Sequence, residues 1–329
     1  MDLMTFKGKN ILITGGLGFI GGNLCIKLVG LGAKVTILDS MMPGHGGNIF
    51  NIEPVKKDAE IIEADIRDEE IINKAVKNKH YIFHLAGQND HVLSLTNPFP
   101  DIDINIKGSA VLLEACKKNN KDARVVYTGT RGEYGSATKL PVNEETPLNP
   151  KGIYELSSLT AQKMFKIYND NHGVKSVTLR LTNIYGERAQ MKHSRFGVAN
   201  WFVRVALDNG TIKVFGDGKI KRDFVYVEDV VDAILLSPLN EGALGEVFNI
   251  GSDKPSCFLE LAETIISAVG KGKWEYAPFS AERAAQEPGD FYSDITKARK
   301  ILGWEPKISL KDGIRRTVEF YAKNKEHYW

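Results

Sequence analysis

The sequence lacks the features that mark several classes of protein. It has three cysteines, Cys25, Cys116 and Cys257, and their spacing matches no metal-binding pattern. No apolar run approaches the length of a membrane span, and the first residues, MDLMTFKGK, contain no apolar signal core. Lysine and arginine (43) nearly balance aspartate and glutamate (41), which gives a net charge of +2 and no basic arm. These absences predict a cytoplasmic protein with reduced thiols and with no metal, membrane or nucleic-acid partner.

What the sequence does contain is a short apolar stretch followed by regularly spaced glycines. Residues 11–14, ILIT, have the pattern of a buried strand, and an apolar helix pattern covers 23–31. Between them lie Gly15, Gly18 and Gly21 at G-x-x-G-x-x-G spacing. The first glycine allows a tight turn, the second admits a pyrophosphate, and the third lets the helix pack closely on the strand. Because a helix N-terminus offers free N–H groups, the stretch predicts a dinucleotide phosphate site.

A second strand pattern, at residues 34–38, ends in an acidic residue that bears on the choice of dinucleotide. This residue is Asp39, eighteen positions after Gly21. A carboxylate at this place accepts hydrogen bonds from the ribose hydroxyls of adenosine and repels a 2′-phosphate. We therefore expect NAD rather than NADP, although Ser40 next to it weakens the preference. The simpler alternative is a glycine-rich loop with an incidental acid, which the ordered series of strand, glycines, helix, strand and acid disfavours.

Strand and helix patterns alternate over the first part of the chain. Strand patterns lie at 11–14, 34–38, 60–64, 81–85, 124–127 and 176–181, and further helix patterns at 68–76, 103–119 and 154–171. The alternation predicts an α/β fold with a Rossmann-type, doubly wound parallel sheet and ligands at the carboxyl ends of its strands. After residue 182 the segments become shorter and more mixed, which indicates a smaller, mixed α/β C-terminal substrate lobe. We expect the dinucleotide domain at 1–181 with returning segments around 222–250, and the substrate lobe at 182–221 and 251–329.

A series of ordered motifs runs nearly from one end of the chain to the other. They are TGGLGFIG at 14–21, ADIRD at 64–68, FHLAGQ at 83–88, NIKGSAVLLEA at 105–115, LRLTNIYG at 179–186, VFGDGKIKRDFVYVEDV at 214–230 and LGWEP at 302–306. In these motifs the chain resembles the extended short-chain dehydrogenase/reductases, specifically their nucleotide-sugar epimerase/dehydratase group. The resemblance implies an enzyme that holds NAD and acts on a UDP-sugar. It also implies a homodimer paired through a four-helix bundle of helices near 105–118 and 154–170.

The resemblance assigns roles to individual residues. For NAD it implies that the pyrophosphate contacts Gly15, Gly18, Phe19 and Ile20, and that the adenosine ribose contacts Asp39. It places the adenine between Asp65 and Ile66, and the nicotinamide half above Leu85, Ala86 and Gly87. For the UDP-sugar it implies that Asn183 contacts the sugar diphosphate and that Val214 and Phe215 lie beside the uracil. It also implies that Arg222 pairs with a phosphate and that Asp290 contacts the nucleotide ribose region. The implied catalytic pair is Tyr154 with Thr130, which polarises the reacting sugar oxygen.

The sequence departs from the family at the active-site motif. In the family a lysine follows the tyrosine by four residues, binds the nicotinamide ribose and lowers the pKa of the tyrosine. Here Ser158 occupies that position after Tyr154, and the next lysine, Lys163, is about two and a half helical turns away. A tyrosine of ordinary pKa near 10 is a poor base at pH 7. The departure therefore predicts either a slow, degenerate enzyme or an altered proton transfer.

His91 is the candidate for sharing that proton transfer. It lies in the loop after FHLAGQ, which reads Asn89-Asp90-His91 where most relatives carry small residues. Histidine exchanges a proton near neutral pH without any tuning, and we expect Asp90 and His91 to act as a pair at the strand end. The alternative is a surface histidine held by its neighbour. His84, inside an apolar strand pattern, is instead expected to be a hydrogen-bonded core histidine.

Three other segments differ from the family pattern or add charge near the predicted site. Arg131-Gly132-Glu133 replaces smaller residues after Thr130, and Gly132 stands where 4,6-dehydratases of the group often carry an acid, which argues against that reaction. Glu287 stands where many relatives have an arginine, a role that Arg283 could take. Lys192, His193 and Arg195 add charge near the expected sugar diphosphate. They either contact the diphosphate or are simply solvated at the surface, and the sequence leaves both open.

These observations predict an NAD-dependent UDP-sugar epimerase or oxidoreductase that acts at C4 through a 4-keto intermediate. One alternative is an oxidoreductase or isomerase of a modified UDP-amino sugar, such as a 4-keto or unsaturated 6-deoxy sugar, for which a weakened tyrosine suffices. The other, from a different class, is a catalytically degenerate protein that still binds NAD and a UDP-sugar. The identity of the sugar stays open.

Overall fold

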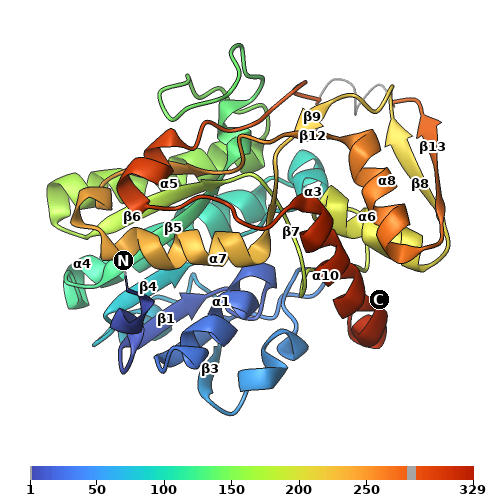
Figure 1. The fold of residues 1–329 in the computed structure, drawn as a ribbon. Coiled ribbons are helices and arrows are strands. Elements are labelled where there is room, and N and C mark those ends of the chain that lie inside the picture. The colour runs from blue at the N-terminus through green and yellow to red at the C-terminus, as the bar shows by residue number, and fades with distance from the viewer. Residues whose placement is uncertain (1, 280–286) are drawn as a thin grey trace.

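The fold is built on a seven-stranded parallel sheet (Figure 1). The computed structural model describes residues 2–279 and 287–329. From one edge to the other the strands are β11 (Val247–Ile250), β6 (Ser176–Leu181), β5 (Arg124–Thr130), β4 (Tyr81–His84), β1 (Asn10–Thr14), β2 (Lys34–Asp39) and β3 (Ala59–Glu63). The order turns back at β1, so the chain winds outward in both directions from the middle. The predicted Rossmann-type sheet is confirmed.

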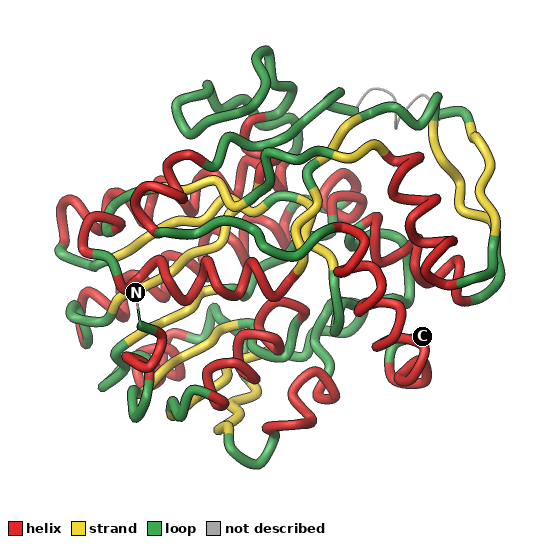
Figure 2. The backbone as a smooth tube through the Cα atoms, viewed as in Figure 1, coloured by secondary structure: helices red, strands yellow, loops and turns green. Residues whose placement is uncertain are grey.

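Helices cover both faces of this sheet (Figure 2). On one face α1 (Phe19–Gly30) packs against α7 (Val227–Leu236), and on the other α4 (Gly108–Asn119) packs between α2 (Glu69–Ala75) and α5 (Ile153–His172). Side chains of a strand alternate between faces, so Ile11 and Ile13 enter the core under α1 while Leu12 enters the core under α4. Burial on both faces explains why the strands read as continuous apolar runs.

Two local features at the front of α4 and α5 depart from the predicted pattern. The helix expected at 103–119 begins at Asp101 and is wound as a π-helix over Asp101–Lys107 before it continues as α4. A short helix, α3 (His91–Thr96), starts in the loop after β4. Both elements lie beside α5 and bring their side chains to the same end of the sheet. A π-turn inside a helix often marks a functional site.

Apart from α7 and β11, the described residues after 182 form a smaller lobe of short strand pairs and helices. The strand pairs are β7 (Asn183–Tyr185) with β10 (Phe224–Tyr226), β8 (Thr211–Phe215) with β13 (Lys273–Ala277), and β9 (Lys221–Arg222) with β12 (Ser256–Cys257). The helices α6 (Val198–Leu207), α8 (Phe258–Val269) and α10 (Leu310–Asn324) share an apolar core. Two segments, α7 and β11, return to the large sheet, as Figure 1 shows.

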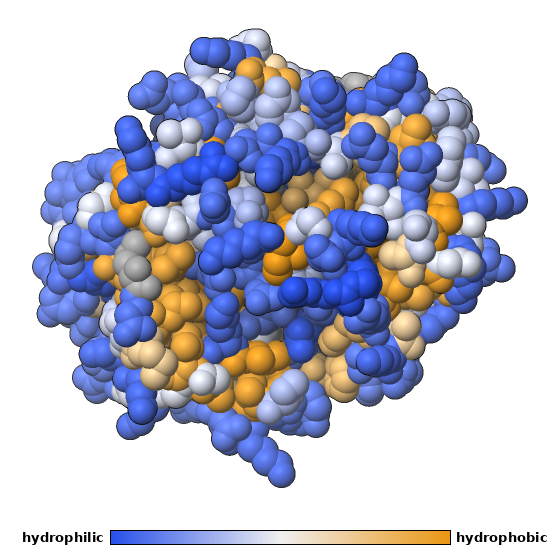
Figure 3. All heavy atoms as spheres, in the orientation of Figure 1, coloured by the Kyte–Doolittle hydropathy of each residue, from blue (hydrophilic) through white to orange (hydrophobic). Residues whose placement is uncertain are grey.

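The surface is mainly polar. Figure 3 shows hydrophilic side chains over most of one face, with apolar side chains gathered in smaller patches between them. Within residues 2–279 and 287–329, no helix combines the length and the apolar character needed to cross a bilayer. Large apolar side chains are also exposed on α3, the π-helical turn and α5.

Candidate active site

A cavity of about 620 Å³ lies where the central parallel strands end. Its walls come from the residues that follow β1 to β6 and from residues 195–200 of the smaller lobe. Every residue predicted to contact the cofactor lines it, as do Tyr154, Thr130, His91 and Asn183. The cavity therefore gathers, at the carboxyl ends of the strands, residues that are far apart in the sequence.

The glycine loop forms a cradle for an anionic group at one end of the cavity. Gly15 has a φ of +71°, and a Cβ there would lie 2.7 Å from the backbone nitrogen of Ala86, so a larger residue does not fit. Helix α1 begins at Phe19, and no side chain caps it, because its N-cap is Gly18. The amides of its first turn are thus left for a ligand. These residues fit the pyrophosphate of a dinucleotide.

Asp39 is held in place beside this cradle by backbone amides. Its Oδ2 accepts a hydrogen bond from the Leu17 amide at 3.0 Å, and its Oδ1 accepts one from the Met41 amide at 2.9 Å. Burial raises the pKa of Asp39, and the two amides oppose that rise. The carboxylate keeps further lone pairs toward the cavity, which fits a ribose with two free hydroxyls. Asp65, at the predicted adenine end, is fixed by both guanidinium contacts of Arg67, at 2.9 and 2.7 Å.

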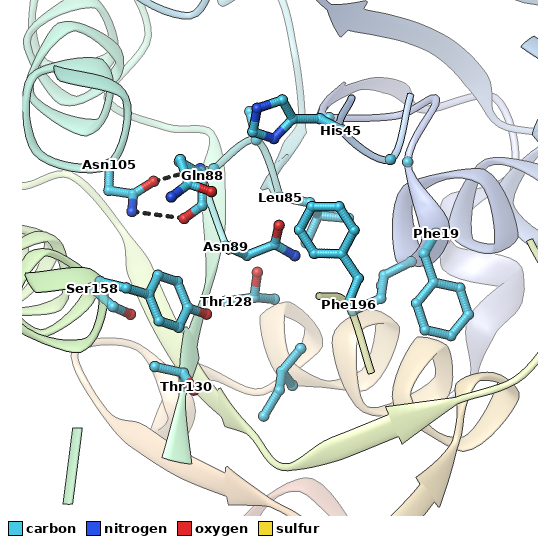
Figure 4. Close-up of a pocket in the computed structure, with 18 of the residues that line it drawn as sticks. Phe19, His45, Leu85, Gln88, Asn89, Asn105, Thr128, Thr130, Ser158 and Phe196 are labelled. Atoms are coloured by element: carbon cyan, nitrogen blue, oxygen red, sulfur yellow. Dashed lines mark hydrogen bonds between the residues drawn. The ribbon is translucent and has the colours of Figure 1, made fainter. Parts of the chain in front are cut away.

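The strand β4 carries the cavity wall on which the nicotinamide half is predicted to lie. His84, at its end, shares hydrogen bonds with Thr14 at 2.8 Å and Ser109 at 3.1 Å. Burial lowers the pKa of His84 to about 4, so the ring is neutral, and its predicted role as a core histidine is confirmed. Next to the wall, Asn105 and Gln88 are joined by two hydrogen bonds of 2.8 and 2.9 Å (Figure 4).

Tyr154 and Thr130 meet in the cavity as the resemblance predicts. Tyr154 lies in the first turn of α5, whose start is held by a hydrogen bond from the Tyr154 amide to Ser94 Oγ at 2.9 Å. Thr130 ends β5, and its side chain lines the cavity beside Tyr154. Burial and the nearby charge of Glu155 raise the pKa of Tyr154, and the side chain of Thr130 only partly opposes that rise. At neutral pH Tyr154 is therefore a phenol and not a phenolate.

Ser158, at the position where the resemblance implies a lysine, belongs to a buried network. Its Oγ donates to Glu133 Oε1 at 3.0 Å and lies 3.2 Å from the hydroxyl of Tyr127. Glu133 is fully buried, and its Oε2 accepts from Arg180 Nε at 3.0 Å. Burial raises the pKa of Glu133, and the charge of Arg180 opposes this. The cation of this network is thus bound to Glu133 and is separated from Ser158 by that carboxylate.

The expected pairing of Asp90 with His91 is wrong. Asp90 turns back on its own helix, because its Oδ1 caps α3 by accepting from the Val92 and Leu93 amides, each at 3.0 Å, and its Oδ2 pairs with Arg195 at 2.6 Å. His91 instead pairs through Nδ1 with Glu155 Oε1 at 2.8 Å. Sequence reasoning missed Glu155 as the partner, although an acid directly after the predicted catalytic tyrosine is a usable signal.

His91 lies against Tyr154 and is open to solvent. The two rings pack edge to face with their centroids 4.5 Å apart, and the His91 side chain is 55% exposed. Burial tends to raise the pKa of Glu155, but the hydrogen bond and charge of His91 outweigh it, so the pKa of Glu155 is lowered. The pair thus links the buried tyrosine to bulk water.

Four of the predicted substrate residues lie outside the cavity. Val214 is fully buried in the core of the smaller lobe, and Phe215 packs against Phe279 with ring centroids 5.6 Å apart. Arg222 is buried and pairs with Glu287, and Asp290 Oδ1 accepts from the Lys221 amide at 2.8 Å. Their contacts with a nucleotide stay predictions. Arg283 lies outside the described residues.

The charged segment near residue 193 bridges two loops at the cavity. His193 Nε2 is 3.2 Å from the carbonyl oxygen of Gly44, in the loop after β2, while the bond of Arg195 to Asp90 reaches the loop after β4. Arg195 lines the cavity, whereas Lys192 is exposed. Figure 4 shows His45 and Phe196 at the same opening, and their ring centroids are 6.2 Å apart.

Similarity to known proteins shows which family this chain belongs to. The model of the NAD-dependent epimerase/dehydratase family matches residues 11–251. The chain belongs to this family. It is 34% identical to a UDP-glucose 4-epimerase of Mycolicibacterium smegmatis over 96% of this chain and 99% of the relative. The glycine cradle and Asp39 agree with the NAD-dependent chemistry of the family.

Two solved members of the epimerase/dehydratase family share the whole fold. A UDP-glucose 4-epimerase of Thermotoga maritima, solved with UDP-glucose, has a TM-score of 0.87 and 33% identity, and the match covers 96% of this chain and 99% of that one. A UDP-glucose 4-epimerase of Thermus thermophilus, in complex with NAD, has a TM-score of 0.84 and 28% identity over 95% and 99%. This protein is accordingly an NAD-dependent, epimerase-like enzyme.

Proposed function

We propose that this protein inverts C4 of a UDP-sugar through a 4-keto intermediate. The observation that carries the proposal is that Tyr154 and Thr130 line one cavity together with the dinucleotide cradle. Two hydroxyls at that place can hold one sugar hydroxyl and leave its carbon facing the cofactor. Similar proteins named as UDP-glucose 4-epimerases support C4 as the reacting carbon.

NAD, when bound, supplies the acceptor of the hydride from C4 and its later donor. The chain's own residues manage the accompanying proton. Thr130 and Tyr154 hold the O4 hydroxyl, and the proton leaves O4 as the C4–H bond breaks. Because the pKa of Tyr154 is raised, the proton passes on to His91, which Glu155 orients and which reaches solvent. Return of the hydride to the other face of C4 and of a proton to O4 gives the epimer.

The test is an incubation of the purified protein with UDP-glucose, UDP-N-acetylglucosamine, UDP-glucuronic acid and a 4-keto-6-deoxy sugar nucleotide. Mass spectrometry and proton NMR follow the products. We expect a product of unchanged mass with an inverted C4 from one of the first three substrates. No change in any substrate, despite binding of UDP and NAD, would show a protein that has lost turnover and would overturn the proposal.

A second candidate is an oxidoreductase or isomerase of an already activated sugar, such as a 4-keto or unsaturated 6-deoxy UDP-amino sugar. The raised pKa of Tyr154 and the hydroxyl of Ser158 in place of a lysine favour it, because such a substrate needs a weaker base. Turnover of the 4-keto-6-deoxy sugar nucleotide alone in the same incubation would select this reaction over epimerisation.

We also propose a homodimer that pairs through α4, α5 and the π-helical turn between α3 and α4. Apolar side chains exposed beside and along this face, on α3, before and in the π-helical turn and on α5, support it: Val92, Leu95, Phe99, Ile102, Leu156 and Ile167 are between 43% and 70% exposed. Sedimentation should show a dimer that Phe99→Glu shifts toward monomer. Tyr276→Glu, an equally drastic change at an exposed residue of the other lobe, should leave the dimer intact. A monomer at all concentrations would refute the pairing.

A further inference from the structure

Arg131 is a cation in the cavity, and the part of the chain that the structure describes offers it no ion-pair partner. It directly follows Thr130, lines the cavity and is partly buried. Its guanidinium lies over the ring of Phe291, 5.0 Å from the centroid. Across residues 2–279 and 287–329, no acceptor forms a hydrogen bond or an ion pair with its N–H groups. Burial and the nearby Arg222 lower its pKa to about 10, which still leaves it charged at neutral pH.

The carboxylates that surround Arg131 are all engaged elsewhere. Asp223, Glu287 and Glu155 each attract its charge, but none lies within ion-pair distance. Glu155 is bonded to His91, and Glu287 to Arg222. Asp223 Oδ2 accepts from the Ser293 hydroxyl at 2.7 Å and from the Ser252 amide at 3.2 Å. Among the described residues, the cavity walls thus supply no counter-ion to Arg131.

We propose that Arg131 is the receptor for a carboxylate carried by the sugar of the substrate. A guanidinium stacked on an aromatic ring is fixed in its plane and presents parallel N–H donors, the arrangement that matches a carboxylate. Its place next to Thr130 puts it beside the sugar and away from the glycine cradle at Gly15 and Gly18. A neutral hydroxymethyl group would leave the partly buried charge without compensation.

The inference rests on the proposed function, because it names the sugar that enters the same site. The competing source of negative charge is the diphosphate of the substrate, which every UDP-sugar carries. A phosphate contact would strengthen the binding of all UDP ligands alike, whereas a carboxylate contact strengthens only acidic sugars. Comparison of UDP, UDP-glucose and UDP-glucuronic acid therefore separates the two sources.

The experiment is calorimetric titration of the NAD-loaded protein with these three ligands. We expect UDP-glucuronic acid to bind at least tenfold more tightly than UDP-glucose. Arg131→Met should weaken UDP-glucuronic acid by about 10-fold to 100-fold and change UDP and UDP-glucose less than about threefold. Arg131→Lys keeps the charge and loses the parallel donors. Its affinity for UDP-glucuronic acid should lie between those of the unaltered protein and Arg131→Met. Lys56→Met removes an exposed cation outside the cavity and should change none of the three affinities.

Three results would overturn the inference. Equal affinity of the unaltered protein for UDP-glucose and UDP-glucuronic acid would do so, because Arg131 would then discriminate nothing. An equal loss for all three ligands in Arg131→Met would assign Arg131 to the diphosphate. Failure of every UDP ligand to bind the unaltered protein would instead remove the proposed function, and the inference with it.

Discussion

Replacing His91 with asparagine separates the two groups that can take the proton from O4. Burial and the charge of Glu155 raise the pKa of Tyr154 above its ordinary value near 10. At pH 7 fewer than about one tyrosine in 10³ is then ionised, which is too few for efficient base catalysis. His91 packs 4.5 Å from that ring and is held by Glu155 at 2.8 Å. Histidine as a residue type changes charge near neutral pH and supplies the acceptor that the tyrosine lacks.

The His91→Asn variant should lose about 10² to 10⁴ in kcat at pH 7, the usual contribution of one general acid or base. The pH profile is the sharper readout. With His91 present, kcat should not follow the ionisation of Tyr154. Without it, kcat should rise about tenfold for each pH unit between 7 and 9, because ionisation of Tyr154 becomes limiting. Initial rates of the epimerisation, measured by proton NMR at each pH, give both quantities.

A matched control is His172→Asn, which makes the same change at the far end of α5, where the ring contacts Tyr168. It should leave kcat and the profile unchanged. The reasoning fails if the unaltered enzyme and His91→Asn show the same kcat at pH 7 and the same rise toward pH 9. Tyr154 alone would then carry the proton despite its burial.

The remaining predictions concern the cradle, the core and the partner of His91. Gly15→Ala should abolish NAD retention, because its Cβ would lie 2.7 Å from the backbone of Ala86; bound cofactor after purification measures this. The unfolded chain protonates His84 near pH 6.5 and the folded chain only near 4, so stability is lost as pH falls through that window, by roughly 2 kcal/mol from pH 7 to 5. In His84→Gln, the free energy of unfolding measured with urea should fall by roughly 2 kcal/mol less between pH 7 and pH 5. Glu155→Gln should lower kcat about tenfold and change KM little, since it removes the group that orients His91, and Glu155→Asp should restore part of the rate.

The sequence predicted the parts of the site that depend on neighbouring residues. The glycine loop, Asp39 at a strand end and the alternation of strands and helices are local patterns, and the parallel sheet then brings the strand ends together. The meeting of Tyr154 and Thr130 followed instead from the family resemblance, and both residues line one cavity.

The partners of the charged side chains could not be predicted in this way. Asp90 and His91 are adjacent in the chain, yet Asp90 bonds to Arg195 and His91 to Glu155, since a helix starts between them and turns the two side chains apart. The hydrogen bond from Ser158 to Glu133 depends on how closely α5 packs on β5 and β6. Such contacts are set by tertiary packing and leave no local pattern.

The bond between Ser158 and Glu133 also constrains the evolution of this site. A lysine introduced at 158 would arrive beside a carboxylate that Arg180 already neutralises, so its ammonium would have to share that carboxylate before it could act on Tyr154. Mutations at 133 and 158 are therefore expected to be epistatic.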